Sequence, residues 1–278
     1  MPGTLYIVAT PLGNLGDLSA RAAELLRTVP VVAAEDTRRT RGLLTHLGAS
    51  PQLLSYHAHS EDRRVEALLA ILDEGRDVAL VSDAGTPAVS DPGSELVAAA
   101  REAGVTVVPI PGPSAVATAL SAAGLKGDRY LFLGFIPRKG GERARLLARA
   151  ASEEWNVVFF EAPPRLVDLL RDLAEAAGVT RRAVVARELT KLHEEFRLGT
   201  LDELTGYYSE HPPRGELTIV LEGTGTPADP PDRTADAVQQ ATLLLAEGLT
   251  RREVVSRLSE TLGLSRNDAY RLVMELPG

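Results

Sequence analysis

Four short segments rich in glycine, proline, aspartate and serine each follow a predicted strand in the first half of the chain. They span residues 10–17, 35–39, 82–87 and 111–115. Open α/β sheets bind ligands at the carboxyl ends of their strands, so these segments are candidate binding loops. Asp83 can accept hydrogen bonds from an amine or a ribose, and Ser114 begins a helix whose free N–H groups suit a carboxylate. A ligand with an amine, a carboxylate and a ribose would match, although each loop alone could be an ordinary turn.

Several titratable side chains at predicted strand ends are candidates for acid–base chemistry. Glu35, Asp36 and His57 could accept a proton, and Lys191 could act as their electrostatic partner. Each has an alternative explanation. Glu35 and Asp36 could cap the helix that follows them, His57 and the nearby His59 could shape a loop, and Lys191 could be solvated.

Two groups of basic side chains are candidates for contacts with the phosphate groups of a nucleic acid. The first group follows the acidic pair on one predicted helix, and the second lies in a glycine-containing segment, 138–145, predicted to be a flexible loop. Arginine suits phosphate oxygens, although a solvated charged surface has the same composition. The candidates are Arg38, Arg39, Arg41, Arg138, Lys139, Arg143 and Arg145.

Composition excludes several classes of protein. The 278 residues are 44% hydrophobic, which is enough for two buried cores of ordinary size. A net charge of −8 argues against non-specific coating of nucleic acid, and the lack of cysteine excludes disulfides and thiolate zinc sites. We expect no metal site, because His57 and His59 form the only close histidine pair. No run of eighteen apolar residues and no secretory signal is present, so we expect a cytoplasmic protein without a membrane partner.

Familiar catalytic motifs are absent from the sequence. There is no phosphate-binding G-x-x-x-x-G-K-[ST] loop and no G-x-S-x-G elbow. The only G-x-G begins at Gly223 and is followed by proline rather than by a helix. The sequence therefore lacks the motifs that would indicate a kinase, an ATPase, a standard dinucleotide-binding protein or a serine hydrolase.

Hydrophobic patterning predicts three structural regions. Residues 1–124 alternate short apolar strands with helices, which indicates an α/β domain with a parallel sheet. Residues 125–224 form a second α/β domain, and two consecutive strands joined around 191–193 indicate a mixed sheet. A proline- and glycine-rich linker, 223–234, precedes residues 235–278, where helical periodicity and two cap signals indicate a helix-turn-helix-like unit. The predicted strands are 5–9, 29–34, 53–56, 78–82, 105–110, 130–135, 156–160, 183–188, 195–199 and 216–221. The predicted helices include 37–47 and 142–151, and Ser19 is a predicted N-cap for the helix that follows it.

Taken in order, seven motifs resemble the tetrapyrrole methylase superfamily and, within it, the small-subunit ribosomal RNA (cytidine-2′-O)-methyltransferases. The resemblance covers the first domain densely, the second through scattered motifs and the tail loosely. It implies two α/β domains of the tetrapyrrole methylase type with a ligand cleft between them, plus the small C-terminal helical unit. The motifs are Val8–Asp17, Ala33–Arg38, Leu80–Pro87, Asp91–Gly93, Pro109–Ala115, Leu120–Gly124 and Ala186–Lys191.

The resemblance also implies a cofactor, a reaction and partners. The methyl donor would be S-adenosylmethionine, and the reaction would be 2′-O-methylation of a cytidine in the decoding region of small-subunit (16S) ribosomal RNA. The partner would be that RNA or the assembled small subunit, with a homodimer expected and no DNA. The donor would lie against Pro11, Gly13, Asp83, Ala84, Gly85, Thr86, Ser114 and Ala115, and the second domain would contribute Glu161, Ala162, Leu189, Glu216 and Leu217.

Two alternatives stay open. The first is a methyltransferase that acts on a small tetrapyrrole or corrin precursor. The first loop, 11–17, lacks the denser glycine pattern usual in those relatives, and the basic segment 138–145 also counts against this alternative. The second is a non-catalytic regulator that contacts DNA through residues 248–276, where the net charge is not positive.

Overall fold

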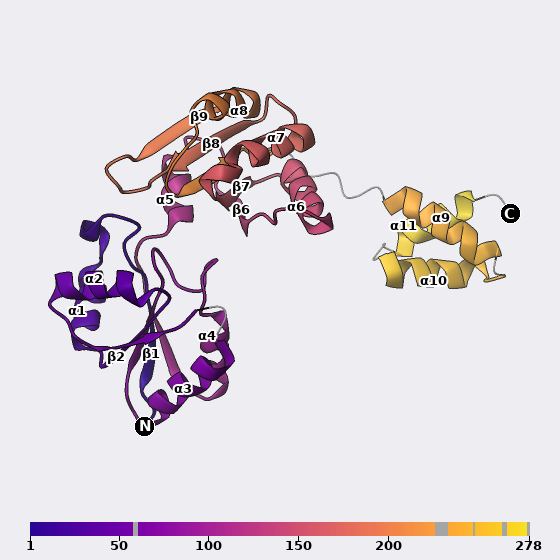
Figure 1. Cartoon of the computed structure of the whole chain (residues 1–278). Coiled ribbons are helices and arrows are strands. Elements are labelled where there is room, and N and C mark those ends of the chain that lie inside the picture. The colour runs from indigo at the N-terminus through magenta and orange to yellow at the C-terminus, as the bar shows by residue number, and fades with distance from the viewer. Residues whose placement is uncertain (58–60, 226–232, 247, 263–265, 277–278) are drawn as a thin grey trace. The chain divides into compact units, whose positions relative to one another are not determined.

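A computed structural model of the chain describes residues 1–57, 61–225, 233–246, 248–262 and 266–276. Residues 1–225 and 226–278 form two compact units, which we describe separately (Figure 1). The middle of the predicted linker, 226–232, lies outside the described residues, as does His59.

The first sheet contains five parallel strands in the order β3-β2-β4-β1-β5. β2 and β4 are buried along their whole length, because helices cover both faces of the sheet. The predicted parallel α/β sheet is therefore confirmed. The strands are β1 (Thr4–Val8), β2 (Val31–Ala34), β3 (Gln52–Ser55), β4 (Val78–Val81) and β5 (Thr106–Ile110).

Two pairs of helices cover the opposite faces of this sheet (Figure 1). Leu26 of α1 (Ala20–Thr28) and Leu44 of α2 (Thr37–Leu47) pack on one face. Leu72 of α3 (Glu61–Asp73) and Leu96 of α4 (Ser94–Glu102) pack on the other. After β1 the chain passes to one face of the sheet, and after β4 it passes to the other face. Because β1 and β4 are neighbours, a crevice opens between the loops at their carboxyl ends.

The second sheet is mixed, as predicted, with the strand order β6-β7-β10-β8-β9. β6 and β7 are parallel, whereas β10 runs antiparallel to both of its neighbours and β8 pairs with β9 as a hairpin. The strands are β6 (Tyr130–Phe135), β7 (Asn156–Glu161), β8 (Arg182–Arg187), β9 (Glu195–Thr200) and β10 (Leu217–Leu221).

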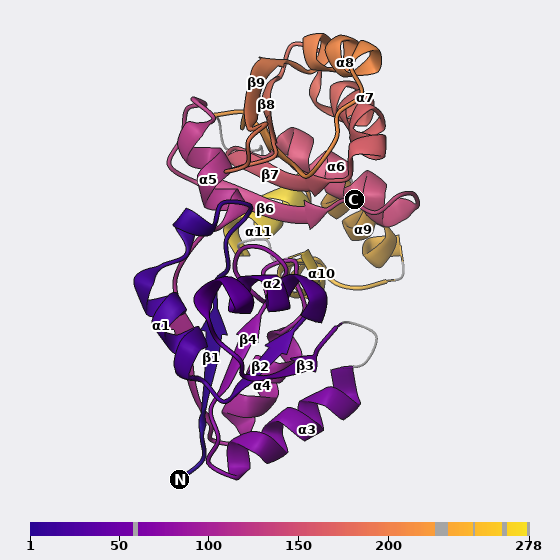
Figure 2. The same cartoon turned by 60° about the vertical axis from the view of Figure 1, so that its left-hand side comes forward.

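Helices cover both faces of the second sheet as well (Figure 2). One face packs against α6 (Gly141–Ser152), α7 (Leu166–Ala177) and α8 (Leu201–Glu210). The other face receives α5 (Ala115–Ala122), which follows the last strand of the first sheet. In the sequence, all strands of the first sheet precede residue 124 and all strands of the second sheet follow it. A domain boundary at this residue stays a prediction.

The predicted basic loop 138–145 overlaps the predicted helix 142–151, and the structure confirms the helix and corrects the second half of the loop, because α6 begins at Gly141. Leu147 and Ala150 are buried against the second sheet, and their packing supports a helix that extends back to the glycine. Arg143 and Arg145 therefore lie on a helix, and Arg138 and Lys139 remain in the loop.

The described residues of the C-terminal unit form three helices, which confirms the predicted helical periodicity. They are α9 (Arg233–Ala246), α10 (Arg251–Leu262) and α11 (Arg266–Glu275). Ala241, Val254, Leu258, Ala269 and Val273 are buried where the three helices meet. Among the residues that the structure describes, no helix has the length and apolar character needed to cross a membrane.

Candidate active site

Hydrogen bonds join the predicted binding loops after β1, β4 and β5. Thr10 and Gly85 exchange two backbone hydrogen bonds of 2.8 and 3.0 Å, which join the loops after β1 and β4. Thr10 Oγ1 donates to the carbonyl of Ser82 at 3.1 Å, and Thr86 Oγ1 donates to the carbonyl of Pro113 at 3.1 Å. The loops after β1, β4 and β5 therefore form one connected edge.

A pocket of about 480 Å³ opens at this edge, between the loops of the first sheet and the ends of β7 and β10. It is lined by most of the side chains that the sequence assigned to a ligand, together with Glu35 and Arg39. Pro11, Gly13 and Leu189 do not line it, and neither do Asp36, His57 or Lys191. The predicted ligand residues in its wall are Asp83, Ala84, Gly85, Thr86, Ser114, Ala115, Glu161, Ala162, Glu216 and Leu217.

One wall of the pocket is apolar, and sequence analysis did not identify it. Phe135 and Phe160 meet edge to face, with ring centroids 5.6 Å apart, and Phe135 is exposed. Leu12, Val89 and Val116 add aliphatic surface to the same pocket. Such a surface suits the flat face of an aromatic ring system. The sequence gives no signal for this apolar wall, because its residues come from five separate segments.

The carboxylate of Asp83 is held in place by the segment that follows β2. The backbone N–H of Asp36 donates to Asp83 Oδ1 at 2.9 Å, and Arg39 Nη1 lies 3.4 Å from Asp83 Oδ2. Asp83 keeps about a quarter of its side-chain surface exposed. It can therefore also accept hydrogen bonds from a bound cation.

Asp36 caps α2, which was the alternative explanation for this residue. Its Oδ1 accepts the backbone N–H of Arg38 at 2.8 Å, and Arg38 Nη2 donates to Oδ2 at 2.7 Å. These hydrogen bonds hold the pKa of Asp36 far below its ordinary value. Such an ionised carboxylate is a poor proton acceptor at neutral pH.

Two other carboxyl groups in the pocket have raised pKa values. Burial and the negative charge of Glu35 raise the pKa of Asp91 to about 7, although a hydrogen bond from Ser82 opposes the shift. Burial, followed by the charge of Asp83, raises the pKa of Glu35. A carboxylate with a pKa close to neutral is suited to accept a proton during a reaction. Asp91 is therefore the strongest candidate for a base in this pocket.

Asp91 belongs to the quoted Asp91–Gly93 motif, but sequence analysis gave it no role in the site. It is positioned by an unusual turn, since Ala88 and Ser90 adopt left-handed backbone angles with φ of 65° and 62°. Such angles are unfavourable for residues other than glycine, and they concentrate at functional sites. Ser90 also lies against Gly134 of β6, where an added Cβ would be 2.8 Å from Ser90 Oγ. The turn thus packs against the second sheet at Gly134.

Glu161 supplies a buried carboxylate to the pocket. Its side chain is inaccessible to solvent, and burial raises its pKa, although Arg165 Nη2 lies 3.2 Å from Oε2. Oε1 accepts the backbone N–H of Ala162 at 2.8 Å. Removing Arg165 would leave this buried charge uncompensated.

Lys191 forms ion pairs with two carboxylates, those of Glu188 and Glu216, and is not a solvated side chain. We call these three residues the Glu188–Lys191–Glu216 clamp. Lys191 Nζ lies 2.9 Å from both Glu188 Oε1 and Glu216 Oε2, and these contacts raise the pKa of Lys191 despite its burial. The aliphatic stem of Lys191 lies over Gly13, where an added Cβ would be 2.2 Å from Cγ. The geometry therefore gives Gly13 a packing role against Lys191.

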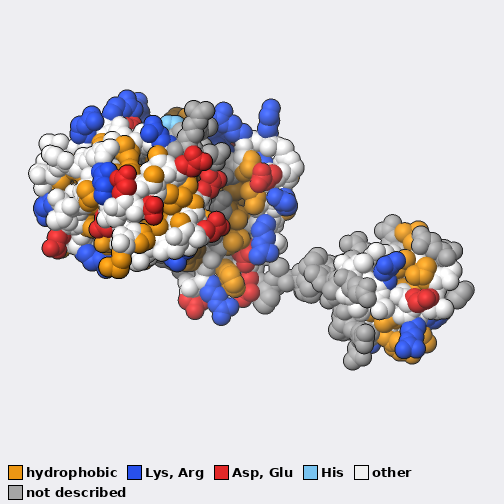
Figure 3. Space-filling view, turned by 90° about the horizontal axis from the view of Figure 1, so that it is seen from below, with side chains coloured by type: hydrophobic (Ala, Val, Ile, Leu, Met, Phe, Trp, Pro, Cys, Tyr) orange, Lys and Arg blue, Asp and Glu red, His pale blue; other side chains and the backbone are white. Residues whose placement is uncertain are grey.

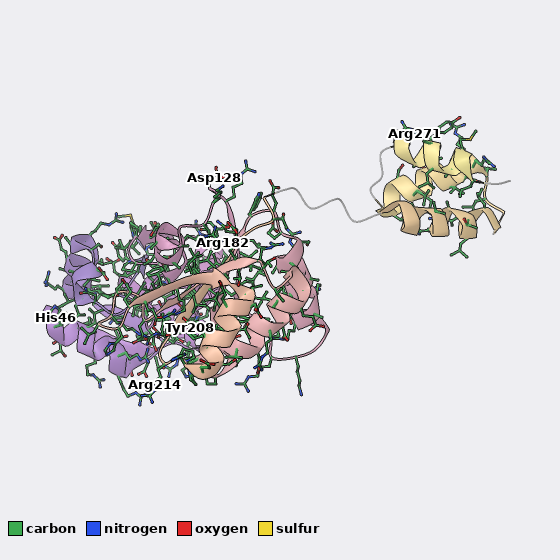
Figure 4. The ribbon with its side chains drawn as sticks, turned by 90° about the horizontal axis from the view of Figure 1, so that it is seen from above. His46, Asp128, Arg182, Tyr208, Arg214 and Arg271 are labelled. Carbon is green, nitrogen blue, oxygen red and sulfur yellow. The ribbon has the colours of Figure 1, made fainter. Side chains whose placement is uncertain are left out.

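Gly215 leaves room for the same clamp. It has a φ of 85°, and an added Cβ would lie 2.1 Å from Glu188 Oε1. Glu188 Oε1 also accepts the backbone N–H of Glu216 at 3.0 Å. Arg214, labelled in Figure 4, comes from the same loop between α8 and β10. The loop that carries Glu216 to the pocket is therefore held by Glu188.

The remaining predicted residues do not line the pocket. Leu189 is buried against the face of the second sheet that packs on α5, and Pro11 sits between Thr10 and the lining residue Leu12. His57 follows β3 at the opposite edge of the first sheet from β5. Among the described residues, no group of three histidine or carboxylate side chains could hold a metal ion.

The basic side chains do not form one broad patch on the face seen in Figure 3, where Lys and Arg are interspersed with Asp and Glu. Arg38 pairs with Asp36, and Arg145 lies 3.9 Å from Glu142. Arg41, Arg138 and Lys139 are exposed. Contact with a polyanion therefore has to rely on small local clusters.

The family model for tetrapyrrole (corrin/porphyrin) methylases matches residues 4–205, and the chain belongs to this family. A solved uroporphyrin-III C-methyltransferase from Thermus thermophilus, in complex with S-adenosylhomocysteine, shares the fold with a TM-score of 0.57 at 20% identity. That match covers 78% of this chain and 97% of the solved one.

The similarity is stronger to proteins named ribosomal RNA small subunit methyltransferase I. The protein of that name from Synechocystis sp. is 46% identical over 99% of this chain and 98% of its own length. The one from Escherichia coli O157:H7 is 44% identical over 99% of this chain and 96% of its own length. The chain therefore falls, over its full length, in the ribosomal RNA branch expected from the seven motifs.

Proposed function

We propose that the protein transfers a methyl group from S-adenosylmethionine to the ribose 2′-hydroxyl of a cytidine in the decoding region of small-subunit ribosomal RNA. The observation that carries the RNA substrate is the identity of 44–46% to proteins named as small-subunit ribosomal RNA methyltransferases. The ribose position and the cytidine rest on the motif resemblance. The chemistry of the pocket supports a methyl donor of this kind.

The pocket residues fit the donor's functional groups. Asp83, Asp91 and Glu216 offer negative charge to the amino group and the sulfonium. Ser114, the N-cap of α5, and Ala115 present the free N–H groups of a helix N-terminus to a carboxylate. Phe135 and Phe160 provide an aromatic wall for an adenine ring. A volume of about 480 Å³ is within the usual range of small-molecule sites.

When bound, the donor supplies a methyl group already activated by its positively charged sulfur. The protein has to align the hydroxyl with the methyl carbon and accept one proton. The donor, held by Asp83, Ser114 and Glu216, would supply this methyl group to the ribose O2′, and Asp91 would accept the proton that the hydroxyl loses. Glu35 lies close enough to help keep the pKa of Asp91 near neutral.

Three further expectations belong to this proposal. The protein is expected to form a homodimer, to lie in the cytoplasm, and to act on either free RNA or an assembled small subunit. Sedimentation of the purified protein measures the first directly.

Replacing Asp83 with Asn is expected to weaken the binding of S-adenosylmethionine by about tenfold or more, because a hydrogen bond to a charged group is lost. One oxygen remains to accept the backbone N–H of Asp36, so α2 should stay in place. Isothermal titration calorimetry measures the affinity.

Asp77→Asn is the matched control for this experiment. Asp77 accepts the backbone N–H of Thr4 at 2.7 Å beside the start of β4, at the end of the strand remote from the pocket. Its variant should bind the donor like the unmodified protein. Equal affinities for all three proteins would contradict the placement of the donor against Asp83.

A further inference from the structure

A second cavity, of about 410 Å³, shares one lining residue, Ala162, with the active-site pocket. Its wall contains Arg138, Arg143 and Arg165, with Pro164 and Asp168. The backbone segment at Ala162 lines both cavities, so the two are neighbours along the chain that leaves β7. Three guanidinium groups around one hollow suit an anion with several oxygen atoms.

Two of the arginines are fixed in position by the second α/β region. Arg143 Nε donates to Asp172 Oδ2 at 2.8 Å, and Arg143 Nη1 donates to the carbonyl of Pro137 at 2.9 Å. Arg165 donates to the carbonyl of Ile136 and pairs with Glu161. A guanidinium that is already held loses little conformational freedom when it binds a ligand.

Arg138 supplies the charge that these pairs leave uncompensated. Arg143 and Arg165 each have a carboxylate partner, and Asp168 lies 3.8 Å from Arg171. Arg138 is exposed and forms no ion pair with the described residues. The cavity therefore has one free positive charge beside two fixed guanidinium groups.

We propose that this cavity binds a phosphodiester group of the RNA next to the ribose that is methylated. The inference rests on the proposed function and adds a defined subsite to it. The 2′-hydroxyl of a ribose neighbours the 3′-phosphate on the same ring, so a ribose in the active-site pocket must bring a phosphate close to it. The shared wall at Ala162 allows both groups to be held at once.

Replacing Arg138 with Gln tests the subsite. The KM for small subunits that lack the methyl group is expected to rise about tenfold, since a charge-assisted hydrogen bond is lost. The dependence of binding on salt should fall by about one counterion in the logarithmic slope. The affinity for S-adenosylmethionine should not change, because Arg138 does not line the active-site pocket.

Arg101→Gln is the control, because the same substitution removes the same charge from an exposed position on α4 that lines neither cavity. An Arg138 variant that behaves like the Arg101 variant in KM and in salt slope would overturn the subsite. Retention of labelled small-subunit RNA on filters gives the same comparison without any reaction. If the wild-type protein retains RNA but transfers no methyl group, the proposed function is wrong. The subsite is then still tested by comparing RNA retention by the two variants.

Discussion

Replacing Asp91 with Asn is expected to lower kcat for methyl transfer by about 10²–10⁴-fold, the usual contribution of a positioned base. Asn has the shape of Asp but cannot accept the proton of the ribose hydroxyl. In the unmodified protein, kcat/KM should rise as the pH increases through about 7, because Asp91 must first lose its proton. The variant should lose this pH dependence. Single-turnover transfer of radiolabelled methyl groups between pH 5.5 and 8.5 measures both effects.

A stability measurement separates this role from a structural one. The pKa of Asp91 is raised in the folded protein, so the folded state favours the protonated carboxyl, and its contribution to stability is lost as the pH rises from about 4 to about 7. Asn resembles the protonated form, so the variant should have a higher Tm than the unmodified protein at pH 8. Full activity in the Asn variant, with an unchanged pH profile, would exclude Asp91 as the base.

Replacing Gly215 with Ala should disrupt the Glu188–Lys191–Glu216 clamp and lower stability by about 1–3 kcal/mol, as expected for a strained backbone position combined with a steric clash. The new Cβ would lie 2.1 Å from Glu188 Oε1, and the residue would have to keep a φ of 85°. Glu216 and Leu217 line the pocket, so donor affinity should fall together with stability. Chemical denaturation and calorimetry measure the two losses.

Alanine variants of two other glycines distinguish the steric clash at Gly215 from the strain of its positive φ. Gly48 has a φ of 67° but nothing within 4 Å of an added Cβ. Gly48→Ala should therefore lower the free energy of unfolding by about 1 kcal/mol without changing the affinity for the donor. Gly206 lies in α8 with open space around it, and Gly206→Ala should be neutral or stabilising by up to about 1 kcal/mol. If the Gly215 variant binds the donor as well as the Gly48 variant does, Glu188 does not control the position of Glu216.

The sequence allowed most of the fold to be predicted, because its elements are short, strongly patterned and bounded by clear signals. The helix expected at 37–47 has those bounds, and Ser19 and Ser114 are the N-caps of α1 and α5. The two strands joined around residues 191–193 pair antiparallel, and the second sheet is mixed, as predicted. Local rules suffice here since strand and cap residues respond to their immediate neighbours.

Parts of the site depend on contacts between distant segments, and these could not be predicted. Asp91 reaches the pocket through left-handed angles at Ala88 and Ser90, which their residue types do not suggest. The sequence predicts a solvated side chain or an electrostatic partner at Lys191, because Glu216 comes within reach only where β8 pairs with β10. The Asp91–Gly93 motif offered a signal that sequence analysis quoted without assigning a role.

The most direct test of the proposed reaction is to incubate the protein with radiolabelled S-adenosylmethionine and small subunits that lack the modification, then digest the RNA to nucleosides. The account predicts label in a single nucleoside, 2′-O-methylcytidine, and none after incubation with the Asp91→Asn variant at equal time. Label on a base, on another nucleoside or on a tetrapyrrole instead of RNA would contradict it.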